Sequence, residues 1–164
     1  MGTTLRAFFL CLVWAGILTM QLNFDADSTA TRRLKDALEL ATHDAALYLK
    51  TDELANGRIV FDQTLATQTL KKSLEMNLSL DTSLTPLSTS FFKDEGQIKL
   101  LLVEFVDDSN TLAYPTNYFN STYEIIDTIE GPAIVAVLET TGPRWFGGTK
   151  KTIRQAVVYE YKHY

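Results

Sequence analysis

The sequence contains few of the residues on which disulfide, metal and catalytic sites depend. Its 164 residues include one cysteine and two histidines. A single cysteine excludes an intrachain disulfide framework and a cysteine-rich zinc site. The formal net charge of −5 argues against nucleic acid as a partner. A composition of 46% apolar and 21% charged residues excludes wholesale disorder, and the length fits one domain of ordinary size.

Charge is also absent from one long segment near the N-terminus. No Asp, Glu, Lys or Arg lies between Ala7 and Phe24, and these 18 residues would rise about 27 Å as a helix, close to the ~30 Å hydrocarbon core of a bilayer. A cleaved signal peptide is the alternative, but only Arg6 precedes the run, and Phe24 fills the position of a small residue before a cleavage site. We therefore predict an uncleaved transmembrane signal anchor over residues 1–24, with the lipid bilayer as a partner. The residues expected to face lipid or neighbouring helices are Phe8, Phe9, Leu12, Ala15, Gly16 and Ile17.

Two arguments about the orientation of this span oppose each other. Arg32, Arg33 and Lys35 follow the span, and counting Lys and Arg alone would place the large domain in the cytoplasm. A very short N-terminal tail before a long C-terminal domain is the usual arrangement of a signal anchor with an external domain. On that ground we predict a single-pass protein of the cell membrane with an extracytoplasmic domain over residues 25–164. This domain carries 14 basic and 20 acidic residues, a charge of −6, which does not suit docking onto anionic lipid.

An amphipathic stalk helix is predicted over residues 28–50. Asp27, Ser28 and Thr29 are candidate N-caps. Apolar residues spaced by three and four positions form one stripe, which consists of Leu34, Leu38, Ala41, Ala45 and Tyr48. The stripe suits a helix that covers a small sheet, and its alanines would also suit packing between subunits. The span could continue into this helix, with residues 23–28 as the only place for a break.

The rest of the chain predicts a second helix followed by strands. After a short strand at residues 58–61, Asp62 begins a segment without Gly or Pro that reaches Leu80. Strand patterns then cover residues 98–106, 123–129, 133–140 and 152–161, with an irregular connection over residues 110–121. The first of these strands is apolar on both faces, which indicates a central position. The fold class is therefore α+β: a long N-terminal helix, a second helix and an antiparallel sheet of three or four strands.

No pattern of catalytic or cofactor-binding residues emerges. His43 adjoins Asp44, but consecutive positions of a helix do not face each other. Asp107, Asp108 and Asn110 are rich in oxygen, yet they lack the spacing of a calcium-binding loop and are typical of a turn after a strand. No nucleophile elbow, phosphate-binding loop or dinucleotide-binding pattern occurs. We expect a protein that is not an enzyme and that holds no cofactor or metal.

The most unusual exposed candidate is Arg144-Trp145-Phe146. These residues lie in the Gly- and Pro-containing connection between the last two predicted strands. Two large aromatic residues beside glycines could contact a partner subunit, or they could fold back onto the edge of the sheet. The sequence leaves both alternatives open.

The layout of a spanning helix, an amphipathic helix and a small antiparallel sheet resembles that of pilins. Residues 34–46 (LKDALELATHDAA) and 57–62 (GRIVFD) resemble TadE-like minor pilin proteins from tight-adherence pilus loci of Gram-positive bacteria. The resemblance implies a minor structural or assembly component of a pilus without a catalytic site. Its partners would be other pilus or secretion-system subunits, contacted through the N-terminal helix.

The sequence departs from processed pilins in its first residues. Those pilins carry a Gly before the peptidase cut and a Glu at the fifth position after it. Here Gly2 would place Ala7 at that position, and no acidic residue occurs before Asp25. We therefore expect entry into a filament without that processing, or a role as an assembly factor that stays in the membrane. A membrane-anchored binding or sensor module of the cell envelope is the second hypothesis.

Overall fold

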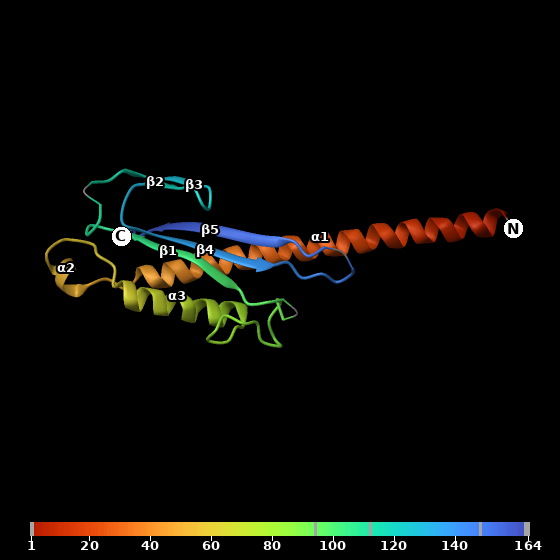
Figure 1. Cartoon of the computed structure of the whole chain (residues 1–164), viewed down its shortest axis with the longest axis horizontal. Helices are drawn as coiled ribbons and strands as arrows, with labels where there is room; N and C mark the ends of the chain where they lie inside the picture. Colours follow the sequence, from red (N-terminus) through yellow and green to blue (C-terminus); the bar gives the residue numbers. More distant parts are fainter. Residues whose placement is uncertain (1, 94, 112, 148, 163–164) are drawn as a thin grey trace.

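A single helix, α1 (Gly2–Ala46), runs along most of the length of the molecule (Figure 1). The computed structural model describes residues 2–93, 95–111, 113–147 and 149–162. Residues 23–28 contain neither Gly nor Pro, and the helix continues through them without a break. Asp27, Ser28 and Thr29 therefore lie inside α1, and their expected role as N-caps was wrong. The stalk also ends at Ala46 rather than at residue 50.

In the part of the chain that the structure describes, two further helices follow α1. The short α2 (Thr51–Ala55) leads to α3 (Gln63–Leu78), which packs against the second half of α1. The helix that was predicted to begin at Asp62 is α3. Asp62 is its N-cap, and the Asp62 side chain accepts a hydrogen bond of 3.0 Å from the backbone N–H of Leu65. The predicted strand over residues 58–61 is absent, because Phe61 forms only an isolated bridge with Leu49.

Within the described residues, five strands form two antiparallel sheets. The larger sheet has the order β1-β4-β5 and consists of β1 (Lys99–Val106), β4 (Ala133–Thr141) and β5 (Thr152–Glu160). A two-stranded ribbon pairs β2 (Thr116–Asn120) with β3 (Ile125–Ile129). The prediction of α+β with an antiparallel sheet of three or four strands is confirmed, with three strands in that sheet. However, β2 lies in the segment that we expected to be irregular.

The central strand is β4, whereas the sequence pattern favoured the segment that forms β1. In the three-layered arrangement of Figure 1, α1 and α3 cover one face of the sheet and the ribbon lies over the other. Val103 and Phe105 pack with the helices, while Leu102 and Val106 pack with the ribbon. An edge strand that is covered on both faces has the same apolar pattern as a central one, and this explains the wrong prediction.

The main hydrophobic core lies between α1, α3 and the sheet. Leu34, Leu38, Ala41 and Ala45 of the predicted stripe are each fully buried there. Tyr48 does not belong to this stripe. It lies beyond the end of α1, where the chain turns toward α2, and it is 41% exposed.

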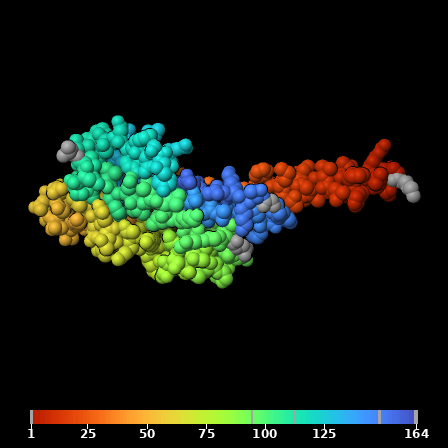
Figure 2. Space-filling model, viewed as in Figure 1, coloured from red at the N-terminus to blue at the C-terminus, as the bar shows by residue number. Residues whose placement is uncertain are grey.

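The first half of α1 stands clear of the rest of the molecule, as Figure 2 shows in red. Among the described residues, α1 is the one helix that is long and apolar enough to span a membrane. None of its apolar window is buried within the chain. The protein therefore carries a candidate membrane span or signal anchor at its N-terminus, and the same helix continues into the core of the folded domain.

Candidate functional site: the exposed half of α1 and its junction with the β4–β5 loop

The predicted membrane and assembly residues all lie on the exposed half of α1. Phe8, Phe9, Leu12 and Ile17 have exposed fractions between 52% and 59%, and Ala15 is also exposed. A Cβ atom added to Gly16 would meet no atom of the chain within 4 Å. This half of the helix therefore presents most of its apolar side chains to the surroundings of the molecule.

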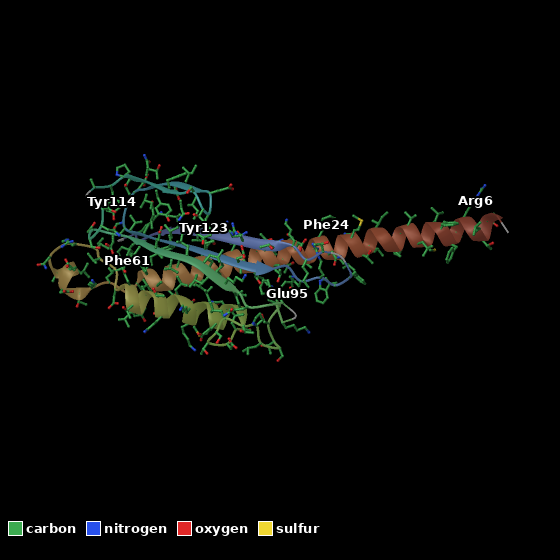
Figure 3. The ribbon with its side chains drawn as sticks, viewed as in Figure 1. Arg6, Phe24, Phe61, Glu95, Tyr114 and Tyr123 are labelled. Carbon is green, nitrogen blue, oxygen red and sulfur yellow. The ribbon has the colours of Figure 1, made fainter. Side chains whose placement is uncertain are left out.

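The connection between β4 and β5 reaches α1 near the end of its apolar run. In Figure 1 this connection extends beyond the sheet along the helix, and Phe24, labelled in Figure 3, marks the level at which the two meet. The side-chain oxygen of Asn23 accepts hydrogen bonds of 3.2 Å from the backbone N–H groups of both Trp145 and Phe146. Its amide nitrogen donates to the carbonyl of Phe146 at 3.3 Å. The Asn23 side chain thus acts as both acceptor and donor toward the backbone at the tip of the loop.

A partly buried ion pair reinforces this contact one helical turn further along α1. Arg144 donates to the carboxylate of Asp27 at 2.9 Å, and the two side chains are 17% and 16% exposed. The Arg144 guanidinium also donates to the carbonyls of Asn23 at 3.4 Å and Thr149 at 3.2 Å. These bonds place Arg144 between helix and loop, where its charge is matched.

Gly142 allows β4 to approach the helix closely at this point. A Cβ atom there would lie 2.8 Å from Oδ1 of Asp27 and 3.1 Å from Cδ1 of Ile153. A side chain at residue 142 would therefore require the Asp27 carboxylate and the Ile153 side chain to shift. We call the contact of Asn23 and Asp27 with Gly142, Arg144, Trp145 and Phe146 the loop–helix junction.

Both aromatic side chains of the junction are exposed. Trp145 is 64% exposed and Phe146 is 44% exposed, so neither is folded into the edge of the sheet. Of the two alternatives that the sequence left open, the fold-back onto the sheet is wrong, and contact with something outside the chain stays a prediction.

The acidic residues after β1 serve the fold. The carboxylate of Asp107 accepts from the backbone N–H groups of Phe61 at 3.0 Å and Ser109 at 2.9 Å, and that of Asp108 accepts from Ile59 at 2.7 Å. These bonds tie residues 59–61 to the end of β1, in agreement with the expected turn. Within the described part of the chain, no group of three His, Cys, Asp or Glu side chains is placed to hold a metal ion.

His43 and Asp44 lie closer together than the helical positions suggested. Nδ1 of His43 is 3.4 Å from Oδ1 of Asp44, so the expectation that they do not face each other was wrong. The other carboxylate oxygen of Asp44 accepts a hydrogen bond of 2.7 Å from the hydroxyl of Ser73, which is 2% exposed. This carboxylate therefore links α1 to α3, and the buried hydroxyl is bonded to the carboxylate rather than to the imidazole.

Two tyrosines of the ribbon region have perturbed acidities. Burial raises the pKa of the Tyr114 phenol, and the charge of Asp108 raises it further. Burial also raises the pKa of the Tyr118 phenol, which donates a hydrogen bond to Glu104 on β1. Both phenols are thus held in the neutral form where the ribbon meets the sheet.

The sequence reasoning singled out the loop of this junction and missed the helix residues that hold it. Asn23 and Asp27 are spaced by four positions, so they lie on one face of α1 just where the apolar run ends. Two polar residues four positions apart at the end of an apolar run could have indicated a contact of this helix face with another part of the chain. Comparison of the chain with protein-family models, with curated proteins and with solved structures found no match.

Proposed function

We propose that this protein is a non-enzymatic, membrane-anchored structural or assembly component of a cell-surface pilus or secretion system, similar to TadE-like minor pilins. One observation carries the proposal: a single uninterrupted helix supplies both the exposed apolar half and the face on which the domain packs. Because the helix has no hinge, its apolar half and the domain keep a fixed position relative to each other. A subunit held in the membrane by the apolar half would therefore hold its domain at a fixed distance from the membrane.

The composition of the apolar half supports contact with other helices as well as with lipid. Inside a bilayer, helices associate through close packing rather than through the hydrophobic effect, and small residues permit that packing. Ala15 and Gly16 supply adjacent small positions near the middle of the exposed run, between the larger Trp14 and Ile17. We therefore place the principal subunit contact around Ala15 and Gly16.

A charged substitution separates assembly from membrane insertion. In Ala15→Asp, one carboxylate at mid-span opposes insertion by roughly 2.5–3.5 kcal/mol, which the remaining apolar residues offset. We expect the variant to stay in the carbonate-resistant membrane fraction and to lose its crosslinks to partner subunits. The matched control, Ser28→Asp, places the same charge on an exposed position of α1 beyond the span and should keep both properties. Crosslinks that persist in Ala15→Asp would contradict the proposed contact.

The second candidate is an envelope binding or sensor module, favoured by the exposed aromatic loop. Such a module would bind its ligand through the domain alone. If a fragment that begins at Asp27 stayed monomeric and bound an envelope ligand tightly, the sensor would replace the structural component as the preferred function.

The placement of the domain outside the cytoplasm is part of the same proposal. Protease added to intact cells should digest residues after the span, and permeabilised cells serve as the positive control. Full protection in intact cells would contradict this placement and would agree with the charge count of Arg32, Arg33 and Lys35.

A further inference from the structure

We infer that the β4–β5 loop rests on the membrane surface and that Trp145 and Phe146 insert into the interfacial region of the bilayer. The inference rests on the membrane anchoring in the proposed function and adds a second, peripheral contact with lipid. It assigns these two aromatic side chains to lipid rather than to a protein partner.

The β4–β5 loop meets α1 at the level where the uncharged run of the helix ends. The uncharged run ends at Phe24, and Asp25 is the first charged residue after it, so the boundary between hydrocarbon and headgroups falls near these positions. The backbone of Trp145 and Phe146 is hydrogen-bonded to Asn23, which lies within one turn of that boundary. A span seated in a bilayer therefore brings the loop to the headgroup region without any change in conformation.

The second argument is the chemistry of the loop tip. Tryptophan is enriched at membrane interfaces because its ring has a large apolar surface and its indole N–H still reaches water or headgroups. Trp145 and Phe146 are the exposed large apolar residues of this loop, and Gly147 beside them adds no bulk. Exposed aromatic rings of this kind suit side chains that reach about 5–10 Å into the interface.

The third argument is the charge around the tip. The Arg144 guanidinium is paired with Asp27, so that no unmatched charge of this pair must leave water when the tip is immersed. Farther along the chain, Lys150 forms an ion pair of 2.9 Å with Glu95, and Lys151 is exposed. The acidic balance of the whole domain does not oppose a contact made by aromatic rings.

Two contacts with the bilayer would fix the domain more firmly than one. A lone helix leaves the domain free to rotate about the helix axis and to tilt. A second contact on one side of α1, held by Asn23 and Arg144, opposes a tilt that would lift that side of the domain from the bilayer. Rotation about the helix axis keeps the loop at the same depth and is not restricted by this contact.

The chain offers a direct fluorescence test because it has two tryptophans, Trp14 and Trp145. In the full-length Trp14→Phe variant, Trp145 is the sole tryptophan. The probe is a vesicle of phosphatidylcholine with bromine atoms either near the headgroup or near the end of the acyl chain. The matched control is full-length Trp145→Phe, in which Trp14 near the middle of the span is the sole tryptophan.

We expect Trp145 to emit at a shorter wavelength in vesicles than in the unfolded chain, and to be quenched more by shallow than by deep bromine atoms. Trp14 should show the opposite depth order. If Trp14 is quenched and Trp145 is not, the interfacial placement of the loop is overturned, while the membrane anchoring by α1 stands. Trp145 and Phe146 would then be assigned to contact with a protein partner. If neither is quenched, the chain does not insert, and both the inference and the proposed anchoring fail.

Discussion

Replacing Arg144 tests how much its ion pair with Asp27 contributes to the stability of the loop–helix junction. In Arg144→Met the Asp27 carboxylate loses its 2.9 Å donor, while its Oδ1 atom already has no hydrogen-bond partner among the described residues. Hydrogen bonds to charged groups contribute about 1.5–3 kcal/mol, and both side chains are less than one-fifth exposed, which limits solvent screening. We expect Arg144→Met to destabilise the domain by about 2 kcal/mol.

A double-mutant cycle with Asp27→Asn isolates the pair from the other bonds of Arg144. A coupling free energy of about 1–2 kcal/mol is expected, within the range found for residues in direct contact. For a chain of this size, 1 kcal/mol corresponds to a shift in melting temperature of roughly 2–4 °C. Full-length protein in detergent micelles would be unfolded thermally and followed by near-ultraviolet circular dichroism. Additive effects, with coupling below about 0.3 kcal/mol, would refute the idea that this pair fixes the loop to the helix.

Three further substitutions test the hydrophobic core, the loop–helix junction and the ribbon. Leu38→Ala should destabilise the chain by about 2–5 kcal/mol because Leu38 is fully buried, whereas Leu40→Ala at a 46% exposed position should cost less than about 0.5 kcal/mol; denaturant unfolding compares them. Gly142→Ala should destabilise by about 1–3 kcal/mol through its 2.8 Å clash with Asp27, and Gly131→Ala, whose nearest atom is at 3.9 Å, is the control in the same unfolding assay. Because burial raises the pKa of Tyr118, its neutral form stabilises the folded state fully below the unfolded pKa of about 10, and this contribution is lost as the pH rises through the folded value. Unfolding at neutral and alkaline pH should therefore show a smaller alkaline loss in Tyr118→Phe than in the parent, and equal losses would contradict the assigned cause.

Local patterns were sufficient to predict most elements of the fold, but not α2 or β2. The Gly- and Pro-free run after Asp62 predicted α3, and the strand patterns predicted four of the five strands of the described residues within a few residues of their ends. These features depend on side-chain periodicity, which is local.

The arrangement of the elements depended on contacts that periodicity does not encode. The apolar pattern of β1 predicted a central strand, because the ribbon that covers its second face includes β2, which comes from a segment expected to be irregular. The continuity of α1 was ambiguous, because a polar stretch within a helix and a break between two helices have the same composition. The junction was found only in part, because Asn23 and Arg144 are far apart in the sequence.

Photocrosslinking along the exposed half of α1 in living cells tests the proposed role most directly. A photoreactive residue would be placed in turn at each position from 8 to 19 of the full-length chain. We predict crosslinks to other membrane-spanning proteins that recur every three or four positions and include Ala15 or Gly16, because one face of the helix would make the contact. If no position in this run yields a protein adduct, α1 serves as a lipid anchor alone, and the role as an assembling subunit is contradicted.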